Sequence, residues 1–182
     1  MKSLPLARWG TIQTPFGPLR AAIDTDGALV ATAFDGLQAL KLRAPLFDYR
    51  EDQGALAPVA RQISAYLRNP KAVFSVKFAP QGSAFQRRVW AALRAIPSGE
   101  TRSYGQLAAE LGSSPRAIGR ANATNPVCLI VPCHRVIGSD GSLTGFAFGE
   151  DIKRGLLAHE GVSVALEKRG SRQPALAASA SP

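Results

Sequence analysis

The local pattern of the 182-residue chain changes from strand-like to helix-like at Ala79–Gly82. Before this break, short apolar runs alternate with turns rich in Gly, Pro and Asp, as in an antiparallel meander. These runs are Gly10–Thr14, Leu19–Ile23 and Leu29–Phe34. Pro58–Leu67 then has apolar residues at helical spacing, so a helix should pack on the sheet. We therefore predict an α+β protein of two domains with a disordered tail. The predicted boundaries are 1–80, 81–165 and 166–182.

Composition excludes several classes of protein. Hydrophobic residues make up 46% of the chain and charged residues 19%, which is typical of a globular protein and not of a disordered or fibrous one. No apolar stretch approaches the roughly 20 residues of a membrane helix, and no apolar region follows the N-terminus as in a secretory signal. We therefore expect no membrane association and a cytoplasmic, reducing location.

The two cysteines, Cys128 and Cys133, lie close together in one apolar segment. Two thiols are too few for a disulfide framework, and the two histidines of the chain add little to a zinc site. We expect free thiols, no metal and no cofactor. The formal net charge of +9 favours a polyanionic partner such as nucleic acid, but the excess is spread along the chain. Charge alone leaves nucleic-acid binding undecided.

Capping signals predict a pair of short helices after the break. Ser83 and Ser103 are each followed three residues later by Gln, the pattern of a capping box that opens a helix. The second of these helices should end at Gly112, and Ser114 with Pro115 should start a third. Two short helices joined by so short a turn indicate a helix-turn-helix.

The third helix should have one basic face with little side-chain bulk. Arg116, Gly119, Arg120 and Ala123 fall at positions i, i+3, i+4 and i+7. Such a face lets the helix backbone approach a nucleic acid closely, although a solvated basic surface is the simpler interpretation of two arginines. The helix-turn-helix frame and the net charge together favour DNA.

The most informative segment is an apolar, strand-like run that ends in Pro132-Cys133-His134-Arg135. A cysteine is nucleophilic only as the thiolate, and His134 is the nearest base. Neighbours in an extended chain point to opposite faces, so the pair would need a bridging water or a sharp turn at Pro132. A buried cysteine that acts only as a small apolar side chain is the alternative, which we keep for Cys128.

The sequence Pro132–Val136 resembles the O6-alkylguanine-DNA alkyltransferases, also called methylated-DNA–protein-cysteine methyltransferases. Further matching motifs are Phe85–Trp90, Ile96–Thr101, Ser103–Ala108, Arg116–Asn122, Asn125–Val127, Gly138–Gly145 and Leu156–Gly161. The resemblance covers residues 83–161 and is weak before residue 80. It implies a small N-terminal ribonuclease-H-like α/β domain, followed by a mostly helical C-terminal domain with the helix-turn-helix.

The resemblance also implies catalytic roles. Cys133 would take the alkyl group from O6 of guanine, and His134 would accept the thiol proton through a water. Glu160 would orient His134, although by sequence alone it is equally a surface helix residue. Tyr104 would donate a hydrogen bond or proton to the leaving guanine, although it is equally a core aromatic. Asn125 would tie the recognition helix to the cysteine segment.

The implied partner is double-stranded DNA that carries O6-alkylguanine or, with less support, O4-alkylthymine. Arg116 would enter from the minor groove and fill the space of the flipped nucleotide. The implied DNA-contacting residues are Arg116, Ala117, Gly119, Arg120, Gln86, Gly105 and Ser139. The implied substrate pocket consists of Val136, Phe146, Ala147, Phe148 and Cys128. We expect a monomer in solution, and cooperativity on DNA stays open.

Three positions depart from the family pattern. The turn Gly112–Pro115 is shorter than usual, Phe146 stands where many members have tyrosine, and Phe148 stands where some have glycine. The first departure puts contacts of the turn in question, the second removes a hydroxyl group, and the third adds bulk to the pocket.

The chemistry fits these residue types. Displacement at a tetrahedral alkyl carbon by a thiolate gives a thioether, which does not hydrolyse, so each molecule should act once. The target atom is inaccessible inside a duplex, so the base must be flipped. The alternatives are a non-catalytic protein that only recognises alkyl lesions, a cysteine hydrolase and a transcription regulator. The first is expected to lack the reactive cysteine, and the second needs a hydrolysable acyl intermediate.

Overall fold

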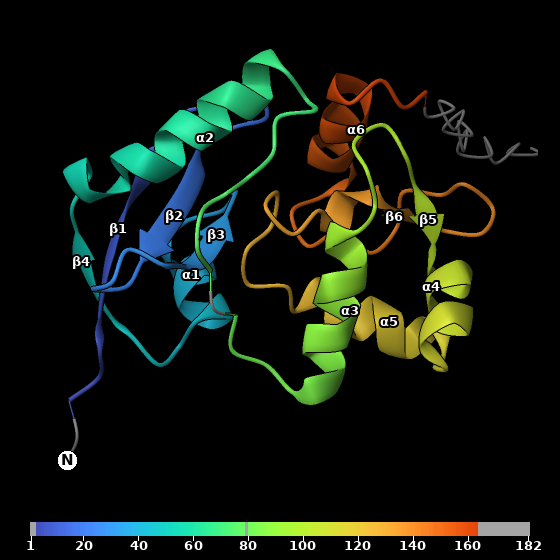
Figure 1. The fold of residues 1–182 in the computed structure, drawn as a ribbon, viewed down its shortest axis with the longest axis horizontal. Coiled ribbons are helices and arrows are strands. Elements are labelled where there is room, and N and C mark those ends of the chain that lie inside the picture. The colour runs from blue at the N-terminus through green and yellow to red at the C-terminus, as the bar shows by residue number, and fades with distance from the viewer. Residues whose placement is uncertain (1–2, 79, 164–182) are drawn as a thin grey trace, which may run out of the picture.

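The computed structural model describes residues 3–78 and 80–163, and it has the mixed α+β composition expected from the sequence (Figure 1). A four-stranded sheet has the order β3-β2-β1-β4. Its strands are β1 (Leu6–Ile12), β2 (Leu19–Ile23), β3 (Leu29–Ala33) and β4 (Asp48–Glu51). The first three form the predicted antiparallel meander, and β4 pairs in parallel with β1. β1 starts and ends earlier than predicted, and the residues that extend its start, Leu6–Trp9, pair with β4.

Helices cover both faces of this sheet. The helix α2 (Ala57–Arg68) follows the short 3-10 helix η1 (Gly54–Leu56) and confirms the predicted helix. Its buried side chains Val59, Ile63 and Tyr66 pack in one apolar cluster with residues of the sheet. Figure 1 shows the helix lying across β1 and β2. The helix α1 (Leu37–Arg43), which the sequence did not predict, places Leu40 against the other face.

The second half of the chain is mostly helical. The helices are α3 (Ala84–Arg94), α4 (Tyr104–Leu111), α5 (Pro115–Ala123) and α6 (Glu150–His159). Both predicted capping boxes are present, at Ser83 and Ser103, and Ser114 caps α5 as expected. The helix α4 ends at Gly112, whose φ of 61° is in the left-handed region that glycine adopts easily. Two short strands, β5 (Arg102–Ser103) and β6 (Val136–Ile137), pair in parallel.

The segment before Cys133 is not the strand-like run expected from its sequence. The N–H of Val131 donates to the carbonyl of Val127 at 2.9 Å, which closes a tight turn. Leu129 inside this turn has a φ of 74°, uncommon for a residue with a side chain. The turn leads into the 3-10 helix η2 (Cys133–Arg135). Strand β3 holds the start of this segment, because the N–H of Thr32 donates to the carbonyl of Pro126 at 2.8 Å.

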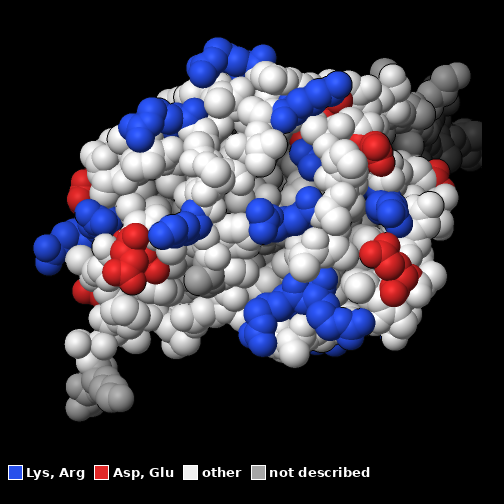
Figure 2. Space-filling view, viewed as in Figure 1, with Lys and Arg blue, Asp and Glu red and all other residues white. Residues whose placement is uncertain are grey.

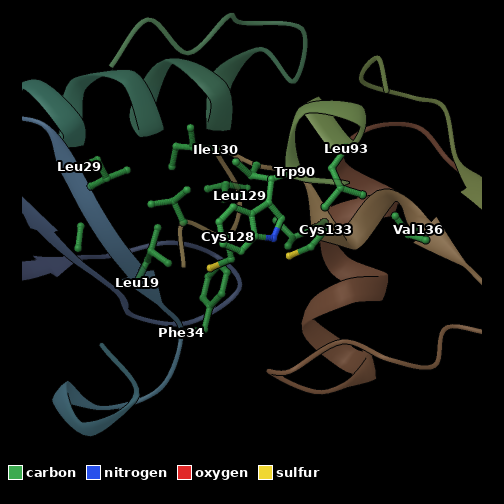
Figure 3. Close-up of a cluster of buried hydrophobic side chains, with 14 of the residues drawn as sticks. Leu19, Leu29, Phe34, Trp90, Leu93, Cys128, Leu129, Ile130, Cys133 and Val136 are labelled. Atoms are coloured by element: carbon green, nitrogen blue, oxygen red, sulfur yellow. The ribbon is translucent and has the colours of Figure 1, made fainter. Parts of the chain in front are cut away.

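One apolar core joins the two halves of the chain (Figure 3). Leu19, Leu29 and Phe34 from the first half lie in the same cluster as Trp90 and Leu93 from α3, around the segment with both cysteines. The boundary at residue 80 and the ribonuclease-H-like label stay predictions, and apolar contacts cross this boundary. The predicted tail at 166–182 lies outside the described residues. None of the described helices is long and apolar enough to cross a membrane.

Candidate active site

Cys133 is the first residue of η2 and lies inside the protein. Its side chain is almost fully buried, and its N–H donates to the carbonyl of Val131 at 2.8 Å. Burial raises the pKa of the Cys133 thiol above its ordinary value, while a hydrogen bond from Asn125 and two nearby cations oppose this rise. A thiol with a raised pKa is protonated at rest, so it needs a base to become a nucleophile.

His134 follows directly, and its imidazole is fully buried. Its Nε2 lies 2.9 Å from Oε1 of Glu160. An ionised carboxylate can only accept, so Nε2 carries the proton and Nδ1 the lone pair. Among the described residues, Nδ1 has no hydrogen-bond partner. Burial lowers the pKa of His134, and the hydrogen bond to Glu160 opposes this effect. The imidazole of His134 is therefore neutral and can act as a base in the residue that follows Cys133.

Glu160 caps the C-terminus of α6 and is buried, so it is not the surface residue that the sequence left possible. Besides His134, its carboxylate accepts from Nε and Nη2 of Arg135, at 2.9 and 2.8 Å, and from the hydroxyl of Tyr66 at 2.8 Å. Burial alone would raise the pKa of Glu160, but the hydrogen bonds and charges of His134 and Arg135 lower it to about 2. The carboxylate is thus ionised whenever His134 acts as a base.

Tyr104 begins α4, and its hydroxyl lies in a network that includes the backbone of the cysteine. The hydroxyl donates to the carbonyl of Thr144 at 3.3 Å. Nδ2 of Asn122 lies 3.4 Å from both the Tyr104 oxygen and the carbonyl of Cys133. Burial raises the pKa of Tyr104, so its phenol is protonated at rest and can act as a donor. Gly145 has a φ of 78°, and a Cβ atom there would collide with the Tyr104 hydroxyl.

Asn125 is fully buried between α5 and the cysteine. Its Nδ2 donates to the carbonyl of Val131 at 2.8 Å, and its Oδ1 accepts from the N–H of Val127 at 3.0 Å. Nη1 of Arg43, from α1, donates to its carbonyl. Asn125 therefore holds the turn that precedes Cys133, which is the position expected for a tie between helix and cysteine.

Phe148, a residue predicted to line the substrate pocket, has aromatic or cationic contacts on three sides. Its ring centroid lies 5.8 Å from that of Phe34 and 5.5 Å from that of Phe146, and the Arg43 guanidinium lies 4.5 Å from it. A cavity of about 440 Å³ lies beside this residue, and its lining includes Arg43 of α1, Ala147 and Phe148. Contacts on three sides restrict the movement of this ring.

Cys128 and Val136, the other two residues assigned to the pocket, have no exposed surface. The thiol of Cys128 lies 3.3 Å from Oγ1 of Thr32, and burial raises its pKa to about 12. The pocket assignments of these residues stay predictions. The thiol of Cys128 faces β3 of the sheet, and its raised pKa makes it a poor nucleophile.

Comparison with known proteins identifies the family. Residues 84–162 match the model described as "6-O-methylguanine DNA methyltransferase, DNA binding domain". A methylated-DNA–protein-cysteine methyltransferase from Methanosarcina acetivorans is 42% identical over 155 residues, which is 84% of this chain and 97% of that protein. The chain belongs to the methylated-DNA–protein-cysteine methyltransferase family. The relative from Mycobacterium tuberculosis strain H37Rv is 38% identical over 161 residues, with 85% of this chain and 93% of that one covered.

Solved structures agree with this family assignment. The crystal structure of Mycobacterium tuberculosis OGT in complex with DNA matches with a TM-score of 0.74 and 39% identity, over 84% of this chain and 92% of that one. The crystal structure of Mycobacterium tuberculosis O6-methylguanine methyltransferase matches with a TM-score of 0.72 and 38% identity, over 85% of this chain and 92% of that one. The methyltransferase fold therefore extends over both halves of the chain.

In this methyltransferase, most residues predicted to contact DNA lie on or beside α5. Arg116 and Arg120 are exposed on α5, and Ala117 and Gly119 are half-buried there. Gln86 joins α3 to the end of α5 through a hydrogen bond of 2.9 Å to Oγ1 of Thr124. The remaining two lie apart from α5: Gly105 is half-buried in α4, and Ser139 is exposed after β6. Their contacts with DNA stay predictions.

The sequence did not indicate a role at the candidate site for four residues, namely Tyr66, Asn122, Arg135 and Lys153. Lys153 is fully buried, and its ammonium donates to the carbonyls of Val136 and Thr144 at 2.6 and 2.9 Å. Burial lowers its pKa to about 8. Helical spacing carries a usable signal for it, since Lys153 lies three and four residues before the buried Leu156 and Leu157.

Proposed function

We propose that the protein repairs DNA by moving the alkyl group of an O6-alkylguanine onto Sγ of Cys133. The observation that carries the proposal is the buried arrangement of Cys133, His134 and Glu160 in a chain of this family. The curated relatives described above are named for transfer to a protein cysteine, and this chain has two cysteines. Of these two cysteines only Cys133 is followed directly by a histidine, which supports this residue as the acceptor. The same names give the non-catalytic alternative no support.

The reaction needs two proton movements. Nδ1 of His134, which has no hydrogen-bond partner among the described residues, takes the thiol proton of Cys133 through a water, and Glu160 stabilises the imidazolium that forms. Sγ then attacks the alkyl carbon while the bond from that carbon to O6 breaks, and the electron pair of this bond stays with guanine. Tyr104 gives a proton to the departing base, and the proton held by His134 replaces it through solvent. Guanine and the alkylated cysteine both end neutral.

The product explains why the protein should act once. The new bond joins sulfur to an alkyl carbon, and a thioether offers no acyl carbon for water to attack. Transfer is therefore irreversible, and each molecule repairs one base. A cysteine hydrolase would instead turn over many times.

The helices α4 and α5 are proposed to form the helix-turn-helix that binds double-stranded DNA. The turn between them is Gly112–Ser114, and α5 presents the exposed Arg116 and Arg120. Figure 2 shows separate groups of Lys and Arg side chains across the viewed face, which fits the spread of the +9 charge along the sequence. Spread positive charge supports contacts with phosphates, and the small residues of α5 let its backbone approach the duplex closely.

Flipping of the damaged nucleotide follows from the burial of the thiol. A base stacked in a duplex cannot reach Cys133, so it must leave the stack, which costs a few kcal/mol. Arg116 is our candidate for the side chain that fills the space it leaves. A monomeric state in solution and a cytoplasmic location also stay predictions.

The test is methyl transfer itself. The protein is incubated with duplex DNA that carries O6-methylguanine, and intact mass and peptide analysis follow. We expect one methyl group on the peptide that contains Cys133. The variant Cys133→Ala should bind the duplex without gaining mass, and Cys128→Ala should still be methylated. The proposal is contradicted by a methyl group on Cys128, by equal loss of methyl transfer in both variants, or by repeated turnover without a methylated protein.

A further inference from the structure

The hydroxyl of Tyr66 reaches the catalytic carboxylate from the other half of the chain. It donates to Oε1 of Glu160 at 2.8 Å, although 94 residues separate the two. Tyr66 belongs to α2 and is almost fully buried. Its ring packs against Phe74 and the edge of His159, with centroid distances of 5.5 and 5.0 Å. These contacts restrict the movement of the phenol and hold its hydroxyl against Glu160.

Oε1 of Glu160 is a shared acceptor. Tyr66, Nε2 of His134 and Nη2 of Arg135 lie at 2.8, 2.9 and 2.8 Å from this one oxygen. A carboxylate oxygen offers about two lone pairs, so three donors compete for it. A hydrogen bond from the phenol partly neutralises the negative charge of Oε1 and so weakens the attraction of this oxygen for the imidazole proton.

We propose that Tyr66 is a positioning residue for alkyl transfer. Its hydroxyl fixes Oε1 of Glu160 and weakens the hold of that oxygen on His134, so that the imidazole stays neutral and free to take the thiol proton. The inference rests on the proposed function of Cys133 as the acceptor, and it makes α2 of the first half part of the catalytic machinery.

The other charged groups around the pair act in a known direction. Arg135 in η2 and Lys153 in α6 are cations that lower the pKa of His134, and the variants proposed below keep both. His159 in α6 contacts the ring and the backbone carbonyl of Tyr66. Burial and the charge of Glu160 raise the pKa of Tyr66 far above its ordinary value, so the phenol donates throughout the working pH range.

The experiment uses Tyr66→Phe, which removes one oxygen and keeps the ring. The pKa of His134 is read from its imidazole NMR signals, and the rate of methyl transfer from duplex DNA is followed between about pH 5 and 9. Without the phenol, Glu160 should hold the His134 proton more tightly and raise its pKa by about one unit. Transfer should then be up to about tenfold slower below that pKa and close to the unmodified rate well above it.

Two controls separate this effect from a structural one. Tyr49→Phe removes a half-buried phenol whose hydroxyl donates to the carbonyl of Ala44 at 2.8 Å, and it should shift neither value. In the background Glu160→Gln, Tyr66→Phe should leave the pKa of His134 unchanged, because the proposed route runs through the carboxylate.

The outcomes are distinct. An unchanged or lowered pKa of His134 in Tyr66→Phe overturns the inference, as does equal slowing at every pH with a lowered unfolding temperature. If the unmodified protein gains no methyl group on Cys133, the proposed function fails instead, whatever the variant does.

Discussion

Replacement of Glu160 by glutamine should lower the free energy of unfolding by roughly 3 kcal/mol near neutral pH. The pKa of Glu160 is about 2, against 4.5 in the unfolded chain, and each unit corresponds to about 1.4 kcal/mol. Loss of one partner from a buried ion pair typically costs about 3 to 5 kcal/mol, which agrees in size. The side chain of Glu160 is fully buried, so solvent does little to screen the lost charge.

The difference should depend on pH in one direction. The lowered pKa of Glu160 stabilises the fold fully above pH 4.5, and this stabilisation is lost as the pH falls through about 2. A protonated glutamate and a glutamine are both neutral. The unmodified protein and Glu160→Gln should therefore approach the same stability toward pH 2, because the difference between them reports this one carboxyl group.

Urea unfolding of both proteins, from about pH 7 down to the lowest pH at which both fold, measures this difference. The control is Glu110→Gln, which removes an exposed ion pair with Arg102 of 3.2 Å and should change stability by at most about 1 kcal/mol. A difference below about 1 kcal/mol for Glu160→Gln at pH 7, or one that stays constant as the pH falls, refutes the electrostatic reasoning.

Two further substitutions test the predicted contacts with substrate. Arg116→Ala should slow repair of duplex DNA far more than reaction with the free modified base, because only the duplex requires extrusion of the nucleotide. Rates of methyl transfer from both substrates test this. Equal slowing on both would mean that Arg116 acts in the substrate pocket or stabilises the fold. Phe148 has contacts on three sides and cannot easily move aside, so O6-benzylguanine should react much more slowly than O6-methylguanine in DNA. A displacement of the reacting carbon by about 1 Å costs on the order of a hundredfold in rate. Phe148→Gly should reduce the difference between the two rates. A slower benzyl reaction in the variant would mean that the ring binds the benzyl group.

Local signals predicted the parts of the fold that depend on neighbours in sequence. The capping boxes at Ser83 and Ser103 consist of hydrogen bonds within four residues, so the sequence alone contains both partners. Strand β4 depends on a partner about forty residues away. Three of its four side chains are exposed, and pairing with β1 defines it. Hydrophobic alternation therefore had nothing to detect there.

The candidate site divides in the same way. Cys133 and His134 are neighbours, and their chemistry was visible in the sequence. The sequence predicted an extended segment for them, whereas a hydrogen bond between Val131 and Val127 closes a turn that contacts Thr32 of β3, far earlier in the chain. Tyr66 has the spacing of a core residue in α2, and only the tertiary fold shows that its hydroxyl meets Glu160. The roles drawn from the family resemblance need the experiments above.

The close contact between Gly145 and Tyr104 links substrate range to reaction rate. The loop that contains Gly145 carries Phe148, which we expect to limit the size of the alkyl group, and Thr144, which accepts from the Tyr104 hydroxyl at 3.3 Å. If this loop moves outward to admit a larger lesion, the phenol that should protonate guanine loses its anchor. A variant whose pocket is widened by moving this loop should therefore also transfer methyl groups more slowly, and selection for broad repair would have to act on both properties together.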